Sequence, residues 1–423
     1  MSPGRGRAEI AALWVVFLLA HLWVALLGWW LPSQPMGDVV LVYEPWSSSA
    51  LGGGAIVGIT EPWVYPQLAL VPMLLANLLS WPLVGAMGVS GAYLVAWAVL
   101  VTVLDAIGFA VLVGLGRTGA RRGRSGPRRT AGWFWCAALL LLGPIAMYRI
   151  DAVTVPIALI GGLWLSRRPV LAAALLTIGA WIKIWPGALA LAAVIAVKRR
   201  VRVLAAAVIV AAAVVAVLFL LGADRELFAF LTQQTGRGLQ IEAVAATPFL
   251  WMALGGAAAI EYSHEILTFQ IRADAAETVS ALLTPVMVLV VLGLAVAGAI
   301  KAARGASWHR LFPPLGLALV TALIVTNKVG SPQFQVWLLV PVMLWIVLDR
   351  TRSVAPSLLT LGLMALTFLV YPLTYDALLR AEYAPILVLS LRNLLLVVLL
   401  IISSRALLRV PAAPRTDPAH RAG

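Results

Sequence analysis

Residues 203–222 read VLAAAVIVAAAVVAVLFLLG, a run without a single charged side chain. A helix needs roughly 20 apolar residues to cross the hydrocarbon core of a bilayer, so this run predicts a membrane-spanning helix. The rest of the chain is similar, because 62% of its 423 residues are hydrophobic and only 11% are charged. Soluble domains average about 25% charged residues. A membrane β-barrel would show short alternating segments instead. We therefore expect an all-α polytopic membrane protein.

Further apolar runs predict about 12 transmembrane helices within one domain over residues 1–404. Residues 68–84 are apolar but contain Pro72 and Pro82, and we expect them to lie along or dip into the outer leaflet. Most of the 31 Lys and Arg residues fall in short loops on one side of this arrangement. The positive-inside rule then predicts a multi-pass plasma-membrane protein with both termini in the cytoplasm. The expected spans are 10–31, 91–116, 131–147, 152–166, 169–183, 186–197, 203–222, 278–300, 311–326, 336–348, 355–372 and 386–404.

Three segments lie outside the expected spans, namely 32–67, 223–277 and 405–423. Residues 32–67 form the first outer loop, and residues 223–277 form a second outer segment whose apolar piece, 249–260, is expected to re-enter the membrane. The first run, 10–31, resembles a signal peptide but is longer than a usual signal core, so we interpret it as a retained span. Residues 405–423 are rich in Pro, Ala and Arg and predict a disordered cytoplasmic tail.

The composition also argues against several classes of site. The net charge of +14 is spread over membrane loops, which indicates topology and gives no reason to expect a nucleic-acid partner. The single cysteine, Cys136, excludes an intramolecular disulfide framework, and four scattered histidines suggest no metal site. We expect neither a metal nor a cofactor. Asp105 lies inside a predicted span, where a hydrogen bond to a neighbouring helix is its expected role.

A few basic residues fall on the outer side and break the inside rule. Charges near hydrocarbon are costly, so each needs a partner or a function. Arg149 either pairs locally with Asp151 or faces an anion in a cavity. Lys183 lies between two tryptophans before Pro186, where it either extends to the interface or contacts an anion. The outward set is Arg149, Lys183, Arg225, Arg237, Arg272, Lys328, Arg380 and Arg392.

Two later outer segments have the composition of an anion site. In the first, glycines flank Arg237, and Gln240 and Glu242 follow closely. Flanking glycines allow close approach of a ligand, and the guanidinium fork suits phosphate. In the second, Lys328 and Gln333 lie between two predicted spans and are expected to donate hydrogen bonds to a phosphate or a sugar. A solvated polar loop is the alternative for both.

The first outer loop holds the candidate for acid–base chemistry. Asp38 follows a Pro-Met-Gly turn, and a carboxylate there is suited to deprotonate an acceptor hydroxyl. Cationic donors on the later loops would stabilise a departing phosphate. Glu44, Glu61 and Tyr65 are expected to form walls of the site. The chain has no Asp-rich metal motif, which favours a lipid monophosphate leaving group held by protein cations.

These residues resemble the polyprenyl-phosphate-sugar-dependent GT-C glycosyltransferases of glycosyltransferase family 87, which include actinobacterial α-(1→2)-mannosyltransferases. The resemblance covers roughly residues 10–400. It implies a GT-C fold, a polyprenyl-phosphate-mannose donor, a glycolipid or polysaccharide acceptor, and inverting transfer on the extracytoplasmic face, with the catalytic aspartate at Asp38. The motifs are Met36-Gly-Asp38, Glu61-Pro-Trp-Val-Tyr65-Pro66, Tyr148-Arg-Ile-Asp151, Ile182-Lys183-Ile-Trp-Pro186, Arg237-Gly-Leu-Gln-Ile-Glu242, and Ser331-Pro-Gln333-Phe with Trp337.

The resulting hypothesis has Asp38 as the general base. Arg149, Lys183, Arg237, Lys328 and Gln333 bind the donor phosphate or sugar, with Asp151, Gln240 and Glu242 in support. Where family members often have Tyr-Pro-Pro, this chain has Tyr65-Pro66-Gln67. Three alternatives remain open: a transporter or flippase of lipid-linked sugars, a non-catalytic scaffold, and an arabinosyl-transferring relative. A transporter with inverted repeats would show related halves, and no repeat is apparent here.

Overall fold

The computed structural model describes residues 3–114, 125–232, 237–263 and 268–412. It is 78% helical. Within the described residues, eight helical segments are long and apolar enough to cross a membrane. The helical content and these apolar segments confirm the prediction of an all-α membrane protein. These segments are Ala8–Leu27, Gln67–Val113, Gly126–Ala146, Arg200–Leu220, Asp274–Ala303, Trp308–Val325, Val354–Leu373 and Tyr383–Leu408.

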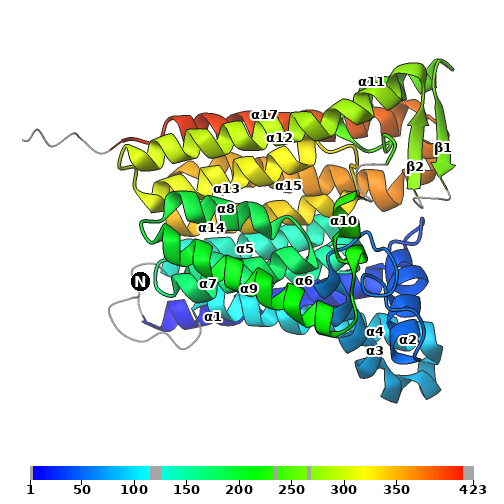
Figure 1. Ribbon diagram of the computed structural model, residues 1–423, viewed down its shortest axis with the longest axis horizontal. Helices are drawn as coiled ribbons and strands as arrows, with labels where there is room; N and C mark the ends of the chain where they lie inside the picture. The colour runs from blue at the N-terminus through cyan, green and yellow to red at the C-terminus, as the bar shows by residue number, and fades with distance from the viewer. Residues whose placement is uncertain (1–2, 115–124, 233–236, 264–267, 413–423) are drawn as a thin grey trace, which may run out of the picture.

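The long helices lie side by side along the long axis of the molecule (Figure 1). They are α1 (Pro3–Leu27), α4 (Val84–Val113), α5 (Ser125–Leu142), α9 (Arg200–Leu220), α12 (Asp274–Ala303), α13 (Trp308–Val325), α15 (Val354–Phe368) and α17 (Tyr383–Leu408). Shorter apolar helices lie among them, namely α6 (Ile150–Trp164), α7 (Pro169–Ile182), α8 (Pro186–Ala196) and α14 (Leu339–Leu348).

Burial divides these helices into an inner and an outer set. Helix α14 is buried from Leu339 to Val347, and most of α13 is buried as well. Helices α9 and α12 instead expose most of their apolar side chains. A helix that is apolar all round and exposed is a helix in contact with lipid. The outer helices therefore shield an interior that includes α13 and α14 from the bilayer.

One break between helices matters for the site. Helix α7 ends at Ile182, Lys183 is extended with φ −149°, and α8 begins at Pro186. Proline suits the first position of a helix because the N–H there has no intrahelical acceptor. The sequence predicted this break at Pro186, and its consequence is that Lys183 lies off both helices.

The first loop and a β-hairpin lie at the same end of the bundle, on the right in Figure 1. The loop contains a π-helical turn (Val39–Tyr43) and α2 (Glu44–Leu51), and α3 (Leu70–Ser80) follows it. The hairpin pairs β1 (Ala259–Ser263) with β2 (Thr268–Arg272) in antiparallel register, Ala259 opposite Arg272. Three short helices complete this end: α10 (Ala229–Thr232), α11 (Thr247–Leu254) and α16 (Tyr375–Leu379).

Asp105 and two apolar segments, 249–260 and 68–84, are assigned specific roles from the sequence. Asp105 Oδ2 lies 3.2 Å from His21 Nε2 of α1, so the predicted hydrogen bond between helices is confirmed. The apolar piece at 249–260 forms part of α11 and the start of β1, and its entry into the membrane stays a prediction. The same holds for 68–84, which forms α3 and a 3-10 turn before α4.

The predicted tail needs one correction. Helix α17 continues to Leu408, so the boundary at 405 is too early. The residues Arg405-Ala-Leu-Leu408 continue the helix because all four have good helix propensity. Residues 413–423, which make up most of the predicted tail, lie outside the described residues.

Candidate functional site

A polar cavity, here called the chamber, opens at the loop end of the bundle. It has a volume of about 690 Å³ and is bounded by the first loop, the hairpin, the α13–α14 connection and α16. Its lining is Ser33, Gln34, Asp38, Val42, Trp46, Val64, Tyr65, Arg149, Arg237, Gln240, Glu242, Tyr262, Thr268, Phe269, Ser331, Pro332, Gln333, Tyr371, Tyr375, Asp376 and Leu379. Residues from six widely separated stretches of sequence therefore meet at one place.

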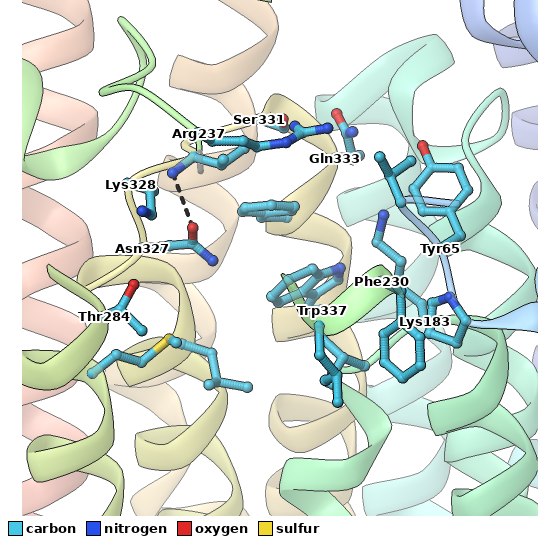
Figure 2. A pocket seen from close by; sticks show the side chains of 18 of the residues that line it. Tyr65, Lys183, Phe230, Arg237, Thr284, Asn327, Lys328, Ser331, Gln333 and Trp337 are labelled. Atoms are coloured by element: carbon cyan, nitrogen blue, oxygen red, sulfur yellow. Dashed lines mark hydrogen bonds between the residues drawn. The ribbon is translucent and has the colours of Figure 1, made fainter. Parts of the chain in front are cut away.

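A second cavity, here called the groove, adjoins the chamber and has a volume of about 360 Å³. Val64, Tyr65, Arg237, Ser331 and Gln333 line both cavities. The rest of the groove is largely apolar, with Ile184, Phe230, Leu231, Met287, Leu323, Phe334 and Trp337 among its lining residues. Figure 2 shows Arg237, Ser331 and Gln333 along one rim, Lys328 and Asn327 on one side, and Tyr65 and Lys183 on the other.

Asp38 lies in the chamber and forms an ion pair with Arg149. Its Oδ2 is 3.2 Å from Arg149 Nε, and its side chain is 37% exposed. The Arg149 side chain is buried and also donates to the carbonyl oxygens of Pro35 and Tyr148, at 2.7 and 2.8 Å. Burial acts to lower the pKa of Arg149, but the Asp38 carboxylate together with the Tyr371 and Tyr43 side chains outweighs burial and raises that pKa above its ordinary value. Arg149 thus fixes both the aspartate and the backbone of the turn before it.

Asp151 makes a separate set of contacts, so the local Arg149–Asp151 pair considered from the sequence is not formed. Its Oδ2 lies 3.6 Å from Lys183 Nζ, and its Oδ1 accepts a 2.5 Å hydrogen bond from Trp337 Nε1. The two side chains are only two positions apart, but Arg149 precedes α6 in extended conformation while Asp151 is in its first turn. They therefore point to different partners.

Lys183, which forms an ion pair with Asp151, also contacts the wall that the two cavities share. Its ammonium lies 4.3 Å from the centroid of the Tyr65 ring, within cation–π distance. Tyr65 itself packs edge-on against Trp46 and Trp63. Two roles are open for Lys183 from the sequence, and extension to the interface is not the one in the structure, because this side chain is buried and lines the groove. Lys183 is placed to contact an anion there.

Arg237 lines both the chamber and the groove. Its Nε is buried and makes no hydrogen bond within the described residues. Burial lowers the pKa of Arg237, and burial likewise lowers the pKa of Lys328, which lines the groove nearby. The lowered pKa of Arg237 indicates that its cationic form is poorly solvated. An anion at the junction of the cavities would accept a hydrogen bond from the buried Arg237 Nε.

Gln240 joins the two segments that the sequence singled out. Its backbone N–H donates to the Lys328 carbonyl at 3.0 Å, and its Oε1 accepts a 2.6 Å hydrogen bond from the Gly330 N–H. Gly330 lies so close to the Glu242 backbone that a Cβ would come within 2.1 Å of it. Only glycine fits this crossing of the two segments.

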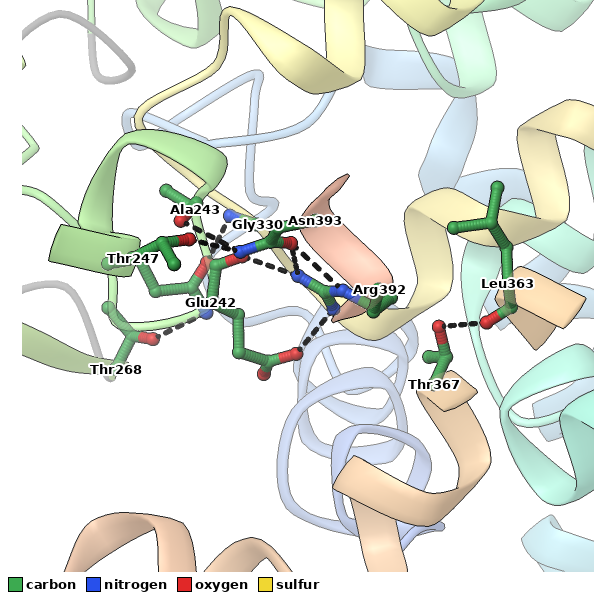
Figure 3. A network of polar contacts seen from close by, with 10 residues as sticks. Glu242, Ala243, Thr247, Thr268, Gly330, Leu363, Thr367, Arg392 and Asn393 are labelled. Carbon is green, nitrogen blue, oxygen red and sulfur yellow. Dashed lines mark hydrogen bonds and ion pairs between the residues drawn. The ribbon is translucent and has the colours of Figure 1, made fainter. Parts of the chain in front are cut away.

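Glu242 anchors the same segments to α17 (Figure 3). Its Oε2 lies 3.1 Å from Arg392 Nη1, and both side chains are almost fully buried. Arg392 also donates to the Glu242 carbonyl and to Asn393 Oδ1, and Asn393 donates to Thr247. Burial raises the pKa of Glu242, and Arg392 opposes that shift. Breaking such a pair leaves one buried charge without a partner, so this contact holds the wall of the chamber.

The sequence-predicted residues fall into two groups. Asp38, Arg149, Tyr65, Lys183, Arg237, Gln240, Glu242, Lys328 and Gln333 line the chamber or the groove, and Asp151 contacts Lys183 behind the groove. Glu44 and Glu61 line neither cavity. Glu44 accepts a hydrogen bond from Ser48 Oγ in α2, and Glu61 is exposed.

Sequence reasoning missed one wall of the chamber. Tyr371, Tyr375 and Asp376 line it beside the first loop, and Tyr371 donates to the Ser33 carbonyl at 2.8 Å. Their signal was the polar Tyr-Pro-Leu-Thr-Tyr-Asp stretch directly after an apolar run. On the hairpin, Tyr262 and Phe269 pack edge-on at 4.9 Å, and Phe269 meets Tyr375 at 6.2 Å. The predicted outer loop thus supplies an aromatic wall.

No group of three or more His, Cys, Asp or Glu side chains suited to a metal ion occurs among residues 3–114, 125–232, 237–263 and 268–412. The expectation that the protein works without a metal or cofactor stays a prediction. No model of a known protein family, no curated protein and no solved structure matches this chain. The chemistry of the two cavities is therefore the ground for a functional proposal.

Proposed function

We propose that this protein is a GT-C glycosyltransferase that moves a sugar, with mannose as the expected hexose, from a polyprenyl-phosphate donor to a glycolipid or polysaccharide acceptor. One observation carries the proposal: an apolar groove and a polar chamber share a wall that contains Arg237 and Gln333. A lipid-linked sugar phosphate has the same order of parts, with an apolar chain, an anionic phosphate and a polar sugar.

The donor can bind across the two cavities in one orientation. Its chain lies along the apolar lining of the groove, which includes Ile184, Met287 and Leu323. Its phosphate lies at the junction, where Arg237 and Lys328 supply positive charge and Lys183 approaches from the Tyr65 side. Its sugar enters the chamber beside Asp38. Guanidinium and ammonium groups are the usual protein partners of phosphate.

The acceptor then enters the chamber from the hairpin side. Tyr262, Phe269 and Tyr375 offer apolar ring faces, and the exposed Asp376 carboxylate offers oxygens to hydroxyl groups. Sugars have apolar C–H faces and polar rims, so a wall of this kind suits a glycan better than a wholly apolar molecule. We place the acceptor hydroxyl between this wall and Asp38.

The reaction is a displacement at the anomeric carbon. The acceptor oxygen forms a bond to that carbon as its proton passes to Asp38, and the bond from the carbon to the phosphate oxygen breaks. Polyprenyl phosphate leaves with the electron pair, and Arg237, Lys183 and Lys328 stabilise its charge. Arg149 engages Asp38 Oδ2, which leaves Oδ1 outside that ion pair. We therefore assign Arg149 a positioning role in place of phosphate binding.

The proposal includes 12 crossings of the membrane. Eight come from the long helical segments, and α6, α7, α8 and α14 supply the others. At 15 residues, α6 is only about 22 Å long. Short helices are compatible with crossing where neighbouring helices surround them, because lipid then does not reach their ends. The chamber lies at the end where the first outer loop is expected, so transfer takes place on the extracytoplasmic face.

The experiment is mass spectrometry of cell-envelope glycolipids from a deletion strain, complemented with wild type or with Asp38→Asn. A missing hexose that only the wild-type gene restores supports the proposal. A missing pentose moves the donor to an arabinose carrier. Unchanged glycolipids in the deletion strain would contradict a role in glycolipid assembly.

A further inference from the structure

Tyr65 of the first loop lines both the chamber and the groove. Among the described residues, the other polar side chains that line both cavities are Arg237, Ser331 and Gln333. Tyr65 therefore faces the junction at which the donor phosphate is expected. The proposed transfer reaction makes no use of this side chain, although a phenol can donate a hydrogen bond to an anion.

The ring of Tyr65 is held by three neighbouring side chains. Lys183 Nζ lies 4.3 Å from the ring centroid. Trp46 and Trp63 pack edge-on against the ring, with centroids 6.1 and 5.5 Å away. Lys183 is itself held by the Asp151 carboxylate at 3.6 Å, and Trp63 is buried. A ring packed in this way is restricted to few rotamers, so its hydroxyl keeps one direction.

The direction of the hydroxyl can be followed in Figure 2, where it lies at the level of the Gln333 amide and the Arg237 guanidinium. The buried Arg237 Nε makes no hydrogen bond within the part of the chain that the structure describes. An anion at the junction would thus meet a guanidinium, an amide and a phenol. Of these three groups, the phenol is the one on the first loop, which also contains Asp38.

The Tyr65 hydroxyl keeps its proton at neutral pH. Burial raises the pKa of Tyr65 above its ordinary value of about 10, and the nearby Lys183 ammonium opposes that shift without cancelling it. A neutral phenol can donate one hydrogen bond, whereas a phenolate would repel a phosphate. Tyr65 is therefore a donor at the pH of the cell envelope.

A second tyrosine, Tyr43, hydrogen-bonds the Tyr65 side chain. The Tyr43 hydroxyl also accepts a hydrogen bond from the Ile150 N–H at 3.2 Å. Tyr43 is fully buried, so its own proton needs an acceptor inside the protein. Donation from Tyr43 to the Tyr65 oxygen satisfies Tyr43 and leaves the Tyr65 proton for a ligand in the cavity.

We propose that the Tyr65 hydroxyl donates a hydrogen bond to a phosphate oxygen of the lipid-linked donor and keeps this bond to the polyprenyl phosphate that departs. A hydrogen bond to a charged acceptor is stronger than one to a neutral group, so the bond favours the phosphate over an uncharged lipid. This role rests on the proposed donor. Its test therefore measures binding of the lipid phosphate without any transfer of sugar.

The test is a titration of the purified full-length protein in detergent, followed by native mass spectrometry. The ligands are polyprenyl phosphate and polyprenol of the same chain length. We expect the wild type to bind the phosphate at least about tenfold more tightly than the alcohol. Tyr65→Phe keeps the ring but removes the donor, and it should weaken binding of the phosphate about tenfold, as for loss of a hydrogen bond to a charged group. Binding of polyprenol should change less than about twofold.

Tyr93→Phe is the matched control, because it removes the same atom from a tyrosine that lines neither cavity. Tyr93 donates to the Met73 carbonyl at 3.1 Å and is buried. This variant should bind both lipids as the wild type does. Replacement of Tyr65 by 3-fluorotyrosine makes the hydroxyl a stronger donor, and at pH 7 it should tighten binding of the phosphate alone.

Three results would overturn this role. If Tyr65→Phe binds the phosphate as tightly as the wild type, the hydrogen bond is excluded while the proposed donor stands. If Tyr65→Phe weakens the phosphate and the alcohol equally, Tyr65 contributes packing only. If the wild type does not prefer the phosphate to the alcohol, the proposed donor itself is wrong, and the role of Tyr65 is excluded with it.

Discussion

The chamber and the groove share a wall but differ in their charged groups. The chamber is lined by the acids Asp38, Glu242 and Asp376 as well as by Arg149 and Arg237, whereas the charged residues that line the groove, among those the structure describes, are all cations. A cavity with carboxylates beside one with cations would suit a substrate that brings hydroxyl groups to the first and an anion to the second. The difference indicates that chemistry and lipid binding are separable by substitution.

The substitution with the largest expected effect on the transfer rate changes the chamber and leaves the groove intact. Asp38→Asn keeps the size of the side chain but cannot take a proton, so transfer should fall about 1,000-fold, within the range for loss of a general base. Donor binding should stay within about twofold, because the groove is unchanged. Steady-state transfer rates and donor titration measure the two quantities. Glu382→Gln, an exposed acid paired with Arg380, is the control and should keep full activity.

The second-largest effect is expected from a substitution in the wall that the two cavities share. Arg237→Gln removes the cation that lines both cavities, and the transfer rate should fall about 100-fold, as for loss of one preorganised donor to a developing charge. Donor affinity should weaken as well, in contrast to Asp38→Asn. Arg272→Gln serves as the matched arginine control because that side chain is 75% exposed and pairs with Glu261. Equal effects of the two arginine variants would remove Arg237 from the site.

A smaller effect is expected when the groove is filled. Met287 on α12 lines the groove, so Met287→Trp should raise the KM for a long-chain polyprenyl donor about tenfold with little change in kcat, the pattern of lost uniform binding. A donor analogue with a short chain should be unaffected. Leu289→Trp, on the same helix but 69% exposed, should behave as wild type. A fall in kcat without a change in KM would show that the chain does not lie here.

The smallest effect concerns pH. Burial lowers the pKa of Lys328, so this side chain loses its charge at a lower pH than an ordinary lysine with a pKa of about 10.4. As the pH rises, donor affinity should therefore weaken several-fold at pH values below about 10.4, where an ordinary lysine is still charged. Lys328→Arg keeps its charge over this range, and its KM should stay flat. Parallel KM profiles of the two proteins would exclude Lys328 from phosphate binding.

The sequence predicted local structure well where one physical rule decides it. The run 203–222 became α9, Arg200–Leu220, because apolar length determines a spanning helix. Pro186 marked the start of α8 because proline is favoured at the first position of a helix. Asp105 contacts His21 on a neighbouring helix, because a buried carboxylate needs a hydrogen-bond partner. These inferences need only neighbouring residues.

The sequence could not predict which distant residues pair. Arg392 and Glu242 are 150 positions apart, and nothing in either segment indicates the other. Arg149 and Asp151 are neighbours in sequence, yet they pair with Asp38 and Lys183. The hairpin was hidden within a predicted outer loop because its strands are only five residues each. Tertiary packing decides all three.

The central claim is that the groove delivers a lipid phosphate so that the chamber can transfer its sugar. Proteoliposomes that contain the purified protein, a radiolabelled polyprenyl-phosphate sugar and an envelope glycolipid acceptor test it directly. We expect label covalently joined to the acceptor, release of polyprenyl phosphate in equal amount, and loss of both with Asp38→Asn. Movement of intact labelled donor across the bilayer, without any glycosylated product, would contradict the account and identify a transporter.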